Sequence, residues 1–262
     1  MAFYFLICLI ATTLGALCGI GGGIIIKPVM DIVTDISVET VSFLSGCTVL
    51  AMSAVSLLLV RGGDAKIEVK KSTSLALGAA VGGIAGKVLF DLIRKGAVND
   101  GSAGMTQSAL LFLLTLGVLA YMTRKSHIRT IRASNIFLCA IIGLLLGITG
   151  SFLGIGGGPI NLIVLYYFFS MDAKSGAINS IYIIFFSQAA GLIWSFAHSG
   201  IPPFSLQILI AMVAGGVFGG FAGRGINRFL SAVWIERVFY VLLVAIAGAS
   251  AYNFANFAAI IR

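Results

Sequence analysis

Charged residues are scarce in this chain, and their scarcity excludes most soluble folds. Only 10% of the 262 residues are Asp, Glu, Lys or Arg, whereas a soluble domain keeps about 25% to cover its surface. The mean hydropathy is correspondingly high, at +1.09. Most of the molecular surface must therefore face something other than water.

Residues and motifs for catalysis or metal binding are also missing. The sequence holds neither HExxH nor GxSxG, and no apolar run carries a pair of acids in register. Hydrolysis needs such convergent groups, and ATP drive needs a phosphate-binding loop that is likewise absent. We therefore expect no enzyme activity, no cofactor and no metal. The four cysteines form no CxxC pair, and we expect them to be apolar packing residues: Cys8, Cys18, Cys47 and Cys139.

Long polar segments are absent, and eight apolar runs fill the chain instead. Each run is about long enough to span a bilayer as a helix. Lipid cannot satisfy backbone polar groups, and barrel strands would alternate over about ten residues, so helices are the favoured spans. We predict an all-α polytopic membrane protein with one domain, 1–262. The runs cover residues 3–20, 40–60, 72–90, 107–123, 134–153, 174–197, 204–223 and 238–261.

The net charge of +8 would suit a nucleic-acid partner, but a membrane explains it better. The basic residues lie in the short connections between runs, as the positive-inside rule predicts. We therefore expect the lipid bilayer as the surroundings and no nucleic-acid partner. The expected location is the inner (plasma) membrane of the cell, with multiple passes.

Two glycine patterns recur along the chain and indicate an internal duplication. The motif GIGGG at 19–23 returns at 154–158, displaced by 135 residues, and Ser45 and Ser180 keep that displacement. We predict two homologous repeats, 1–130 and 131–262. Glycines at every fourth position let helices pack closely, within one bundle or between the copies of a homo-oligomer. These ladders are Gly78, Gly82 and Gly86, then Gly215, Gly219 and Gly223, followed by Lys87 and Arg224 as expected snorkelling anchors.

The GIGGG motifs predict broken helices at equivalent places, in the first and fifth segments. Glycine weakens a helix by about 1 kcal/mol per residue, and Pro28 and Pro159 favour a new helix start soon after each motif. The start of a helix offers free amides and partial positive charge, which bind anions. Paired discontinuous helices point to the substrate site of a transporter. The alternative is that these glycines serve only tight packing.

Polar residues inside apolar runs complete the candidate substrate site. Asn161 falls in the first turn of the second half-helix, and Lys27 is the cation nearest a break, although it could equally snorkel outward. For the serines and amides, hydrogen bonding between helices is the alternative role. Asp31 is expected in a solvated loop. The candidate set is Gly21, Gly22, Gly23, Gly156, Gly157, Gly158, Asn161, Ser45, Ser180, Asn179, Lys27 and Gln188.

The doubled glycine motif resembles that of the TauE/SafE sulfite exporter family. The similarity covers the whole chain, with Gly19–Pro28 as the first copy and Gly150–Pro159 as the second. In the second copy the proline follows the glycine run directly, so the second bend differs in detail. The resemblance implies transport of small organosulfur or sulfur oxyanions such as sulfite, sulfonates and sulfoacetate. The alternatives are an anion channel or a transporter of another small carboxylate.

The distribution of Lys and Arg favours inverted repeats. These residues divide 12 to 3 between the two sides if both broken segments return to the side they entered, but 9 to 6 if both cross. The sharper division fits the positive-inside rule better. We therefore favour re-entrant broken segments, both termini outside the cytoplasm, and transport by alternating access between the repeats.

Overall fold

The chain is all helical in the computed structural model, which describes residues 1–60, 67–96, 100–199 and 201–261. The predicted helical membrane fold is thus confirmed. These residues form ten α-helices, of which six are long and apolar enough to cross a membrane. The six are α3 (Val38–Leu58), α4 (Val69–Gly96), α5 (Asp100–Arg124), α8 (Ala173–Trp194), α9 (Leu206–Phe229) and α10 (Ala232–Ile261).

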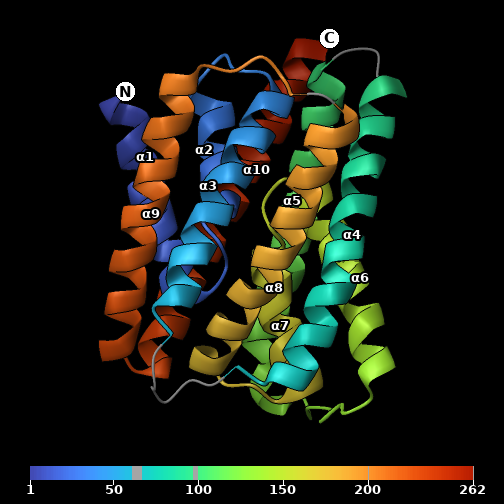
Figure 1. Cartoon of the computed structure of the whole chain (residues 1–262), viewed down its shortest axis with the longest axis vertical. Coiled ribbons are helices and arrows are strands. Elements are labelled where there is room, and N and C mark those ends of the chain that lie inside the picture. Colours follow the sequence, from blue (N-terminus) through green and yellow to red (C-terminus); the bar gives the residue numbers. More distant parts are fainter. Residues whose placement is uncertain (61–66, 97–99, 200, 262) are drawn as a thin grey trace.

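The remaining four α-helices form two hairpins. The first hairpin is α1 (Ala2–Cys18) with α2 (Gly23–Val33), and the second is α6 (Ile136–Phe152) with α7 (Gly158–Phe169). Both breaks fall at the GIGGG motifs. Figure 1 shows that the first hairpin begins and ends at the end of the bundle that holds both chain termini. We call this the terminal end.

The second hairpin begins and ends at the opposite end of the bundle. There the amide of Ile131, ahead of α6, donates to the carbonyl of Tyr167 near the end of α7, at 2.7 Å. The amide of Ala133 donates in the same way to the carbonyl of Phe168, also at 2.7 Å. Both broken segments therefore return to the end from which they start, as the charge distribution predicts.

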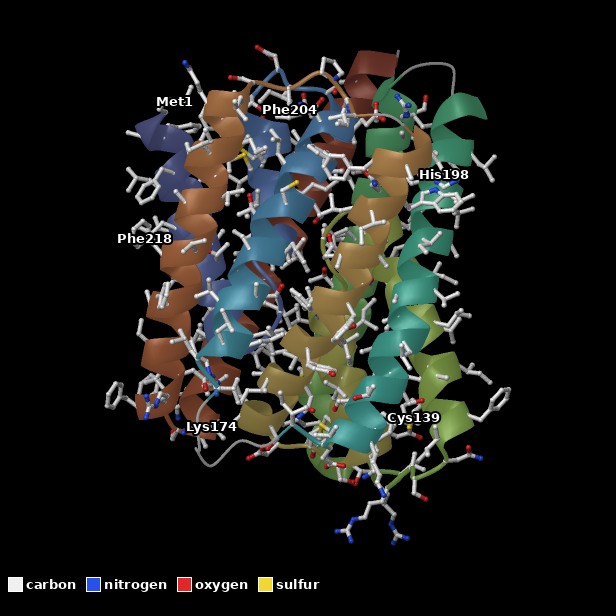
Figure 2. All side chains as sticks on the ribbon, viewed as in Figure 1. Met1, Cys139, Lys174, His198, Phe204 and Phe218 are labelled. Atoms are coloured by element: carbon white, nitrogen blue, oxygen red, sulfur yellow. The ribbon has the colours of Figure 1, made fainter. Side chains whose placement is uncertain are left out.

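The six long helices run from one end of the bundle to the other. Figure 2 places Met1 and Phe204 at the terminal end, and Lys174 and Cys139 at the opposite end. The segments around Lys174 and at 124–133 and 223–237, which carry eight of the 17 Lys and Arg residues, lie at that opposite end. Of the connection 61–71, the residues 61–66 lie outside the described part.

The glycine ladders bring helices of the two chain halves into close contact, which confirms their predicted packing role. A Cβ atom on Gly78 of α4 would lie only 2.0 Å from the carbonyl oxygen of Ala140 on α6. A Cβ atom on Gly223 of α9 would lie 2.2 Å from the carbonyl oxygen of Thr13 on α1. Small residues permit such backbone contact in lipid. The ladder of α4 thus packs against α6, the first helix of the second hairpin. The ladder of α9 packs against α1, the first helix of the first hairpin.

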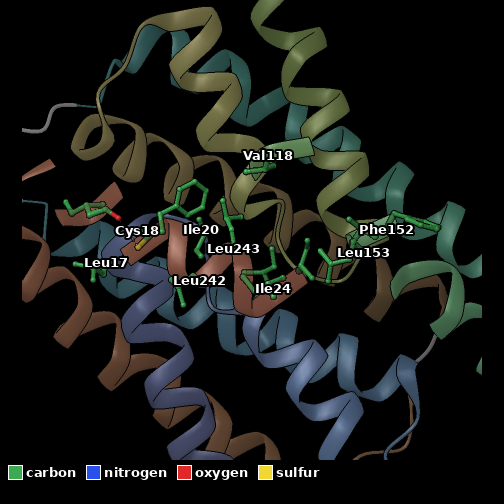
Figure 3. Packing of buried hydrophobic residues seen from close by; sticks show 14 of the residues in the cluster. Leu17, Cys18, Ile20, Ile24, Val118, Phe152, Leu153, Leu242 and Leu243 are labelled. Carbon is green, nitrogen blue, oxygen red and sulfur yellow. Dashed lines mark hydrogen bonds between the residues drawn. The ribbon is translucent and has the colours of Figure 1, made fainter. Parts of the chain in front are cut away.

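The turns of both hairpins lie in the buried core. Figure 3 shows Ile20 of the first turn and Leu153 of the second in one apolar cluster with Val118 of α5 and Leu243 of α10. All four side chains are at most 4% exposed. The long helices α5 and α10 therefore hold the turns from one side.

Candidate functional site

The first turn is formed by glycines in the left-handed conformation. Gly19 ends α1 with φ of 78°, and its amide donates to the carbonyl of Gly15 at 2.8 Å. Such a left-handed residue commonly closes a helix. The chain then folds back so tightly that a Cβ on Gly15 would lie 2.5 Å from the backbone nitrogen of Gly22. The first turn therefore needs glycine for conformation at Gly19 and for space at Gly15.

The second turn repeats this geometry. A Cβ on Gly150 would lie 2.6 Å from the backbone nitrogen of Gly157, which has φ of 87°. The carbonyl of Gly150 accepts hydrogen bonds from the amides of Ile155 and Gly156, at 3.1 and 3.2 Å. In this conformation the amide of Gly156 is therefore not offered to a ligand. In the described residues all glycines with positive φ lie in the two turns: Gly19, Gly21, Gly154, Gly156 and Gly157.

The two turns cross each other in direct contact. A Cβ on Gly158, where α7 begins, would lie 2.2 Å from the carbonyl oxygen of Ile20 in the first turn. A Cβ on Gly23, where α2 begins, would lie 2.9 Å from the carbonyl oxygen of Ile155 in the second. Each helix start thus faces the other turn. The partial positive charge of each helix start is directed into the centre of the bundle.

Two of the long helices, α3 and α8, line these turns and carry the predicted serines. Val49 of α3 and Ile184 of α8 both lie within 3.4 Å of the position that a Cβ on Gly156 would take. Ser45 and Ser180 come one helical turn before Val49 and Ile184, on the same faces. Both serines are fully buried, and neither hydroxyl has a hydrogen-bond partner within residues 1–60, 67–96, 100–199 and 201–261.

Asn161 lies beside the second turn, as its place in the first turn of α7 predicts. A Cβ on Gly157 would lie 3.0 Å from its side-chain oxygen. Asn161 is 1% exposed, and this oxygen has no hydrogen-bond partner. Buried polar groups are normally paired. The two serines and Asn161 thus leave hydrogen-bonding capacity unused near the crossed turns.

A polar cavity of about 360 Å³ lies on the terminal side of the second turn. It is bounded by the first part of α3, the last parts of α4, α6 and α8, and the second turn itself. Hydroxyl, amide and ammonium groups line it, and Gln188 is the predicted residue among them. The lining residues are Ser42, Phe43, Gly46, Lys87, Ser151, Gly154, Gln188, Gly191, Leu192 and Ser195.

Lys27 does not extend to the membrane surface. It is 3% exposed, and its ammonium group forms an ion pair with Asp31 at 3.0 Å inside α2. The expectation of a solvated loop around Asp31 is therefore wrong, because α2 continues past this residue and buries it. A Cβ on Gly154 would lie 3.5 Å from the side-chain Cδ of Lys27. The ion pair thus lies close to the second turn.

Asn179 belongs to a different part of the bundle. Its side-chain oxygen accepts hydrogen bonds from the hydroxyl of Ser72 and, at 3.2 Å, from the amide of Glu68. Its side-chain nitrogen donates to the carbonyl of Ser175 at 2.7 Å. These contacts connect the start of α4 to α8, which is the interhelical role that the sequence left open for this residue.

A second cavity, of about 440 Å³, lies on the other side of the crossed turns. Cys18, the last residue of α1, lines it together with residues from α7, from the end of α5 and from the starts of α8 and α10. Most of its lining is apolar. Lys125 and Glu236, which form an ion pair at 2.5 Å, contribute charged groups. Cavities therefore lie on both sides of the crossed turns.

Sequence reasoning did not select several residues of the polar cavity. Ser151 directly follows Gly150 and belongs to the second motif, and Ser195 lies seven residues after Gln188, which is two helical turns. The sequence could have indicated both serines, because Ser151 adjoins a motif glycine and Ser195 lies on the same helix face as Gln188. The predicted snorkelling of Arg224 is wrong. This side chain is 7% exposed and donates to the side-chain oxygen of Asn227 at 3.1 Å.

Comparisons with known proteins identify the kind of molecule that carries this arrangement. The chain is similar to the protein named "Probable membrane transporter protein YunE" of Bacillus subtilis. The two are 25% identical over an alignment 271 residues long, gaps included, which covers 94% of this chain and 96% of that protein. Over 113 residues the chain is 26% identical to "Probable membrane transporter protein MamO" of Magnetospirillum gryphiswaldense, covering 41% of this chain and 18% of that protein. No solved structure matches.

The family comparison covers almost the whole chain. Residues 4–250 match the family model described as "Sulfite exporter TauE/SafE". This range includes both hairpins, both turns and the cavities on either side of them. The chain is therefore a multi-pass membrane transporter, not an enzyme, and it belongs to the sulfite exporter TauE/SafE family.

Proposed function

We propose that this transporter moves small sulfur oxyanions, of the sulfite, sulfonate or sulfoacetate type, past the two crossed turns. The polar cavity at the second turn carries the proposal. It combines one cation with neutral hydroxyl and amide donors, and it ends at a glycine turn. Neutral donors suit an anion that must be released again, because they neutralise little of its charge. The description of the matched family names sulfite.

The anion would be held at the centre by the helix starts and by the unused polar groups around them. The first turns of α2 and α7 offer amides and partial positive charge. Ser45, Ser180 and Asn161 offer polar atoms that have no hydrogen-bond partner among the described residues. In this conformation the two turns touch. A bound anion therefore requires the two turns to separate slightly.

Alternating access between two inverted repeats is the mechanism we propose for the passage. The packing of helices supports it, because α4 contacts α6 and α8, while α9 contacts α1 and α3. In the two predicted repeats, 1–130 and 131–262, α4 corresponds to α9, α1 to α6 and α3 to α8. The contacts of α4 in one repeat therefore match the contacts of α9 in the other. The hairpins open to opposite ends, as inverted repeats require. Rocking of one half against the other would open one cavity while it closes the other.

Sulfite flux into proteoliposomes tests the proposal. The panel is sulfite, sulfoacetate, taurine, thiosulfate, sulfate, acetate and chloride, with an imposed potential. An interior-negative potential favours anion exit by about 2.3 kcal/mol per charge per 100 mV. We expect saturable flux of one sulfur oxyanion. Flux that never saturates would indicate a channel, and absence of anion flux under any gradient would refute the substrate class.

Serine variants test the central site. Removal of a hydrogen bond to a charged group costs about 1.5–3 kcal/mol, so Ser45→Ala and Ser180→Ala should each raise KM about tenfold or more. Neither should lower the melting temperature, because neither hydroxyl has a hydrogen-bond partner in the part of the chain that the structure describes. Ser53→Ala is the matched control on α3, since that hydroxyl bonds the carbonyl of Leu50 at 2.9 Å. A native KM in both serine variants would place the anion elsewhere.

A further inference from the structure

Two cations that follow the glycine ladders each lie beside one of the crossed turns. Lys87 lines the polar cavity together with Gly154 of the second turn. Arg224 is joined to the first turn through Asn227, whose side-chain nitrogen donates to the carbonyl of Leu17 at 2.6 Å. Leu17 lies two residues before Gly19. The two cations therefore lie near different turns of the same crossing.

Arg224 is buried with part of its hydrogen-bonding capacity unused. The side chain is 7% exposed, and one guanidinium nitrogen, Nη1, donates to the side-chain oxygen of Asn227 at 3.1 Å. Another guanidinium nitrogen, Nε, is buried and has no hydrogen-bond partner among the residues that the structure describes. A charge inside a membrane protein is costly and usually marks a pathway for substrate or ions. The unused donor indicates that Arg224 serves a ligand rather than the packing of α9.

Lys87 lies among charged groups from α2, α3 and its own helix, α4, with Asp91 four residues further along α4. Its ammonium group lies 5.2 Å from the centre of the Phe90 ring, and the charged groups that act on it are Asp91, Glu39, Arg94 and Lys27. Glu39 is paired with Arg94 at 2.7 Å. Lys27 is paired with Asp31 at 3.0 Å. Lys87 is the cation of this group that lines the cavity.

The two positions also share their local arrangement. In each case the residue three positions later on the same helix contacts the cation: Phe90 contacts Lys87, and Asn227 contacts Arg224. Residues three apart are neighbours on a helix face. This contact holds each cation against its own helix and near its turn.

We propose that Lys87 and Arg224 are the two cationic anion-binding positions of the transport path, one for each side of the membrane. Lys87 binds the anion that arrives from the terminal end, and Arg224 binds the anion that arrives from the opposite end. The proposal rests on the proposed transport of sulfur oxyanions and adds the residues that capture them. In this conformation Lys87 lines the polar cavity, whereas Arg224 is enclosed and lines neither of the two cavities described above.

Side-specific kinetics test the assignment. Sulfite transport would be measured in right-side-out and in inverted membrane vesicles, with the terminal end predicted to lie outside. Lys87→Met should raise KM about tenfold or more in right-side-out vesicles, and Arg224→Met should do so in inverted vesicles. Lys87→Arg should retain a KM within about threefold of the native value, because the positive charge is kept. The matched controls are Lys70→Met on α4 and Arg228→Met on α9, which remove an exposed cation from the same helices.

A second variant covers the case in which Arg224→Met fails to fold, as judged by size-exclusion chromatography. Asn227→Asp keeps the shape of the side chain but places a carboxylate against Arg224, so it should also raise KM in inverted vesicles. Native KM values for Lys87→Met and for the folded Arg224 or Asn227 variant would overturn the inference, as would equal increases in both kinds of vesicle. Absence of saturable flux of every sulfur oxyanion in the panel by the native protein would instead refute the proposed function itself.

Discussion

At the scale of single residues, the buried ion pair in α2 shows how the fold treats charge. Lys27 and Asp31 are each 4% exposed in their side chains and lie 3.0 Å apart. Spacing of four residues on one helix brings such side chains together. Once both are enclosed, removal of one partner leaves an uncompensated charge, which costs much more than loss of an exposed pair.

The first prediction concerns this pair. Asp31→Asn should lower the free energy of unfolding by about 3–5 kcal/mol, measured as a large drop in the melting temperature in detergent. The double variant Lys27→Met with Asp31→Leu should recover much of the loss, because no charge remains buried. Glu68→Gln is the control, since the pair of Glu68 with Lys71 is exposed and is worth about 0–1 kcal/mol. Equal effects of Asp31→Asn and Glu68→Gln would contradict the structure.

At the scale of elements, the glycine ladders determine how closely helices approach. Gly78 lies where α4 meets the backbone of α6, so that no side chain fits between them. Around Gly117 of α5, no described atom outside its own stretch of helix lies within 4 Å of the position of an added Cβ. Replacement of glycine by alanine should therefore destabilise the protein at Gly78 but not at Gly117.

The second prediction uses this contrast. Gly78→Ala should force α4 and α6 apart and lower the melting temperature, because the new methyl group would meet the carbonyl of Ala140 at 2.0 Å. Gly117→Ala should leave the melting temperature unchanged or raise it, since alanine favours a helix over glycine by about 1 kcal/mol. Thermal unfolding of the two purified variants provides the measurement. A neutral effect of Gly78→Ala would show that α4 and α6 do not pack as described.

At the scale of the whole molecule, the re-entrant hairpins determine the topology. Six long helices cross from end to end, and each hairpin returns to the end from which it starts. An even number of crossings places both termini on one side. The basic connections lie at the other end, which the positive-inside rule assigns to the cytoplasm.

The third prediction is that both termini lie outside the cytoplasm. A reporter enzyme that is active only outside the cytoplasm should be active when it is fused after residue 262. The same reporter should be inactive when it is inserted at 124–133. A cysteine-specific, membrane-impermeant reagent applied to whole cells should label a cysteine substituted at the exposed Ser205, next to Phe204 at the terminal end, but not one substituted at Lys174. The reverse pattern would invert the orientation proposed for the transport path.

Much of the fold could be predicted from the sequence, and less of the site. Apolar runs located the long helices, and the GIGGG motifs located the two breaks, because glycine runs and span length act locally. Asn161 was correctly placed beside the second turn for the same reason. The contacts of Asn179 with Ser72 could not be foreseen, since they join residues more than 100 positions apart.

The sequence by itself determined that the chain is a helical membrane protein with two glycine breaks, because hydropathy and glycine content act within one segment. Only the tertiary structure decided that the two turns cross in contact, that the ion pair of Lys27 and Asp31 is enclosed, and that Arg224 is enclosed near the first turn. These features depend on how helices from the two halves pack together. Packing of this kind follows from shape in three dimensions, which local sequence patterns do not record.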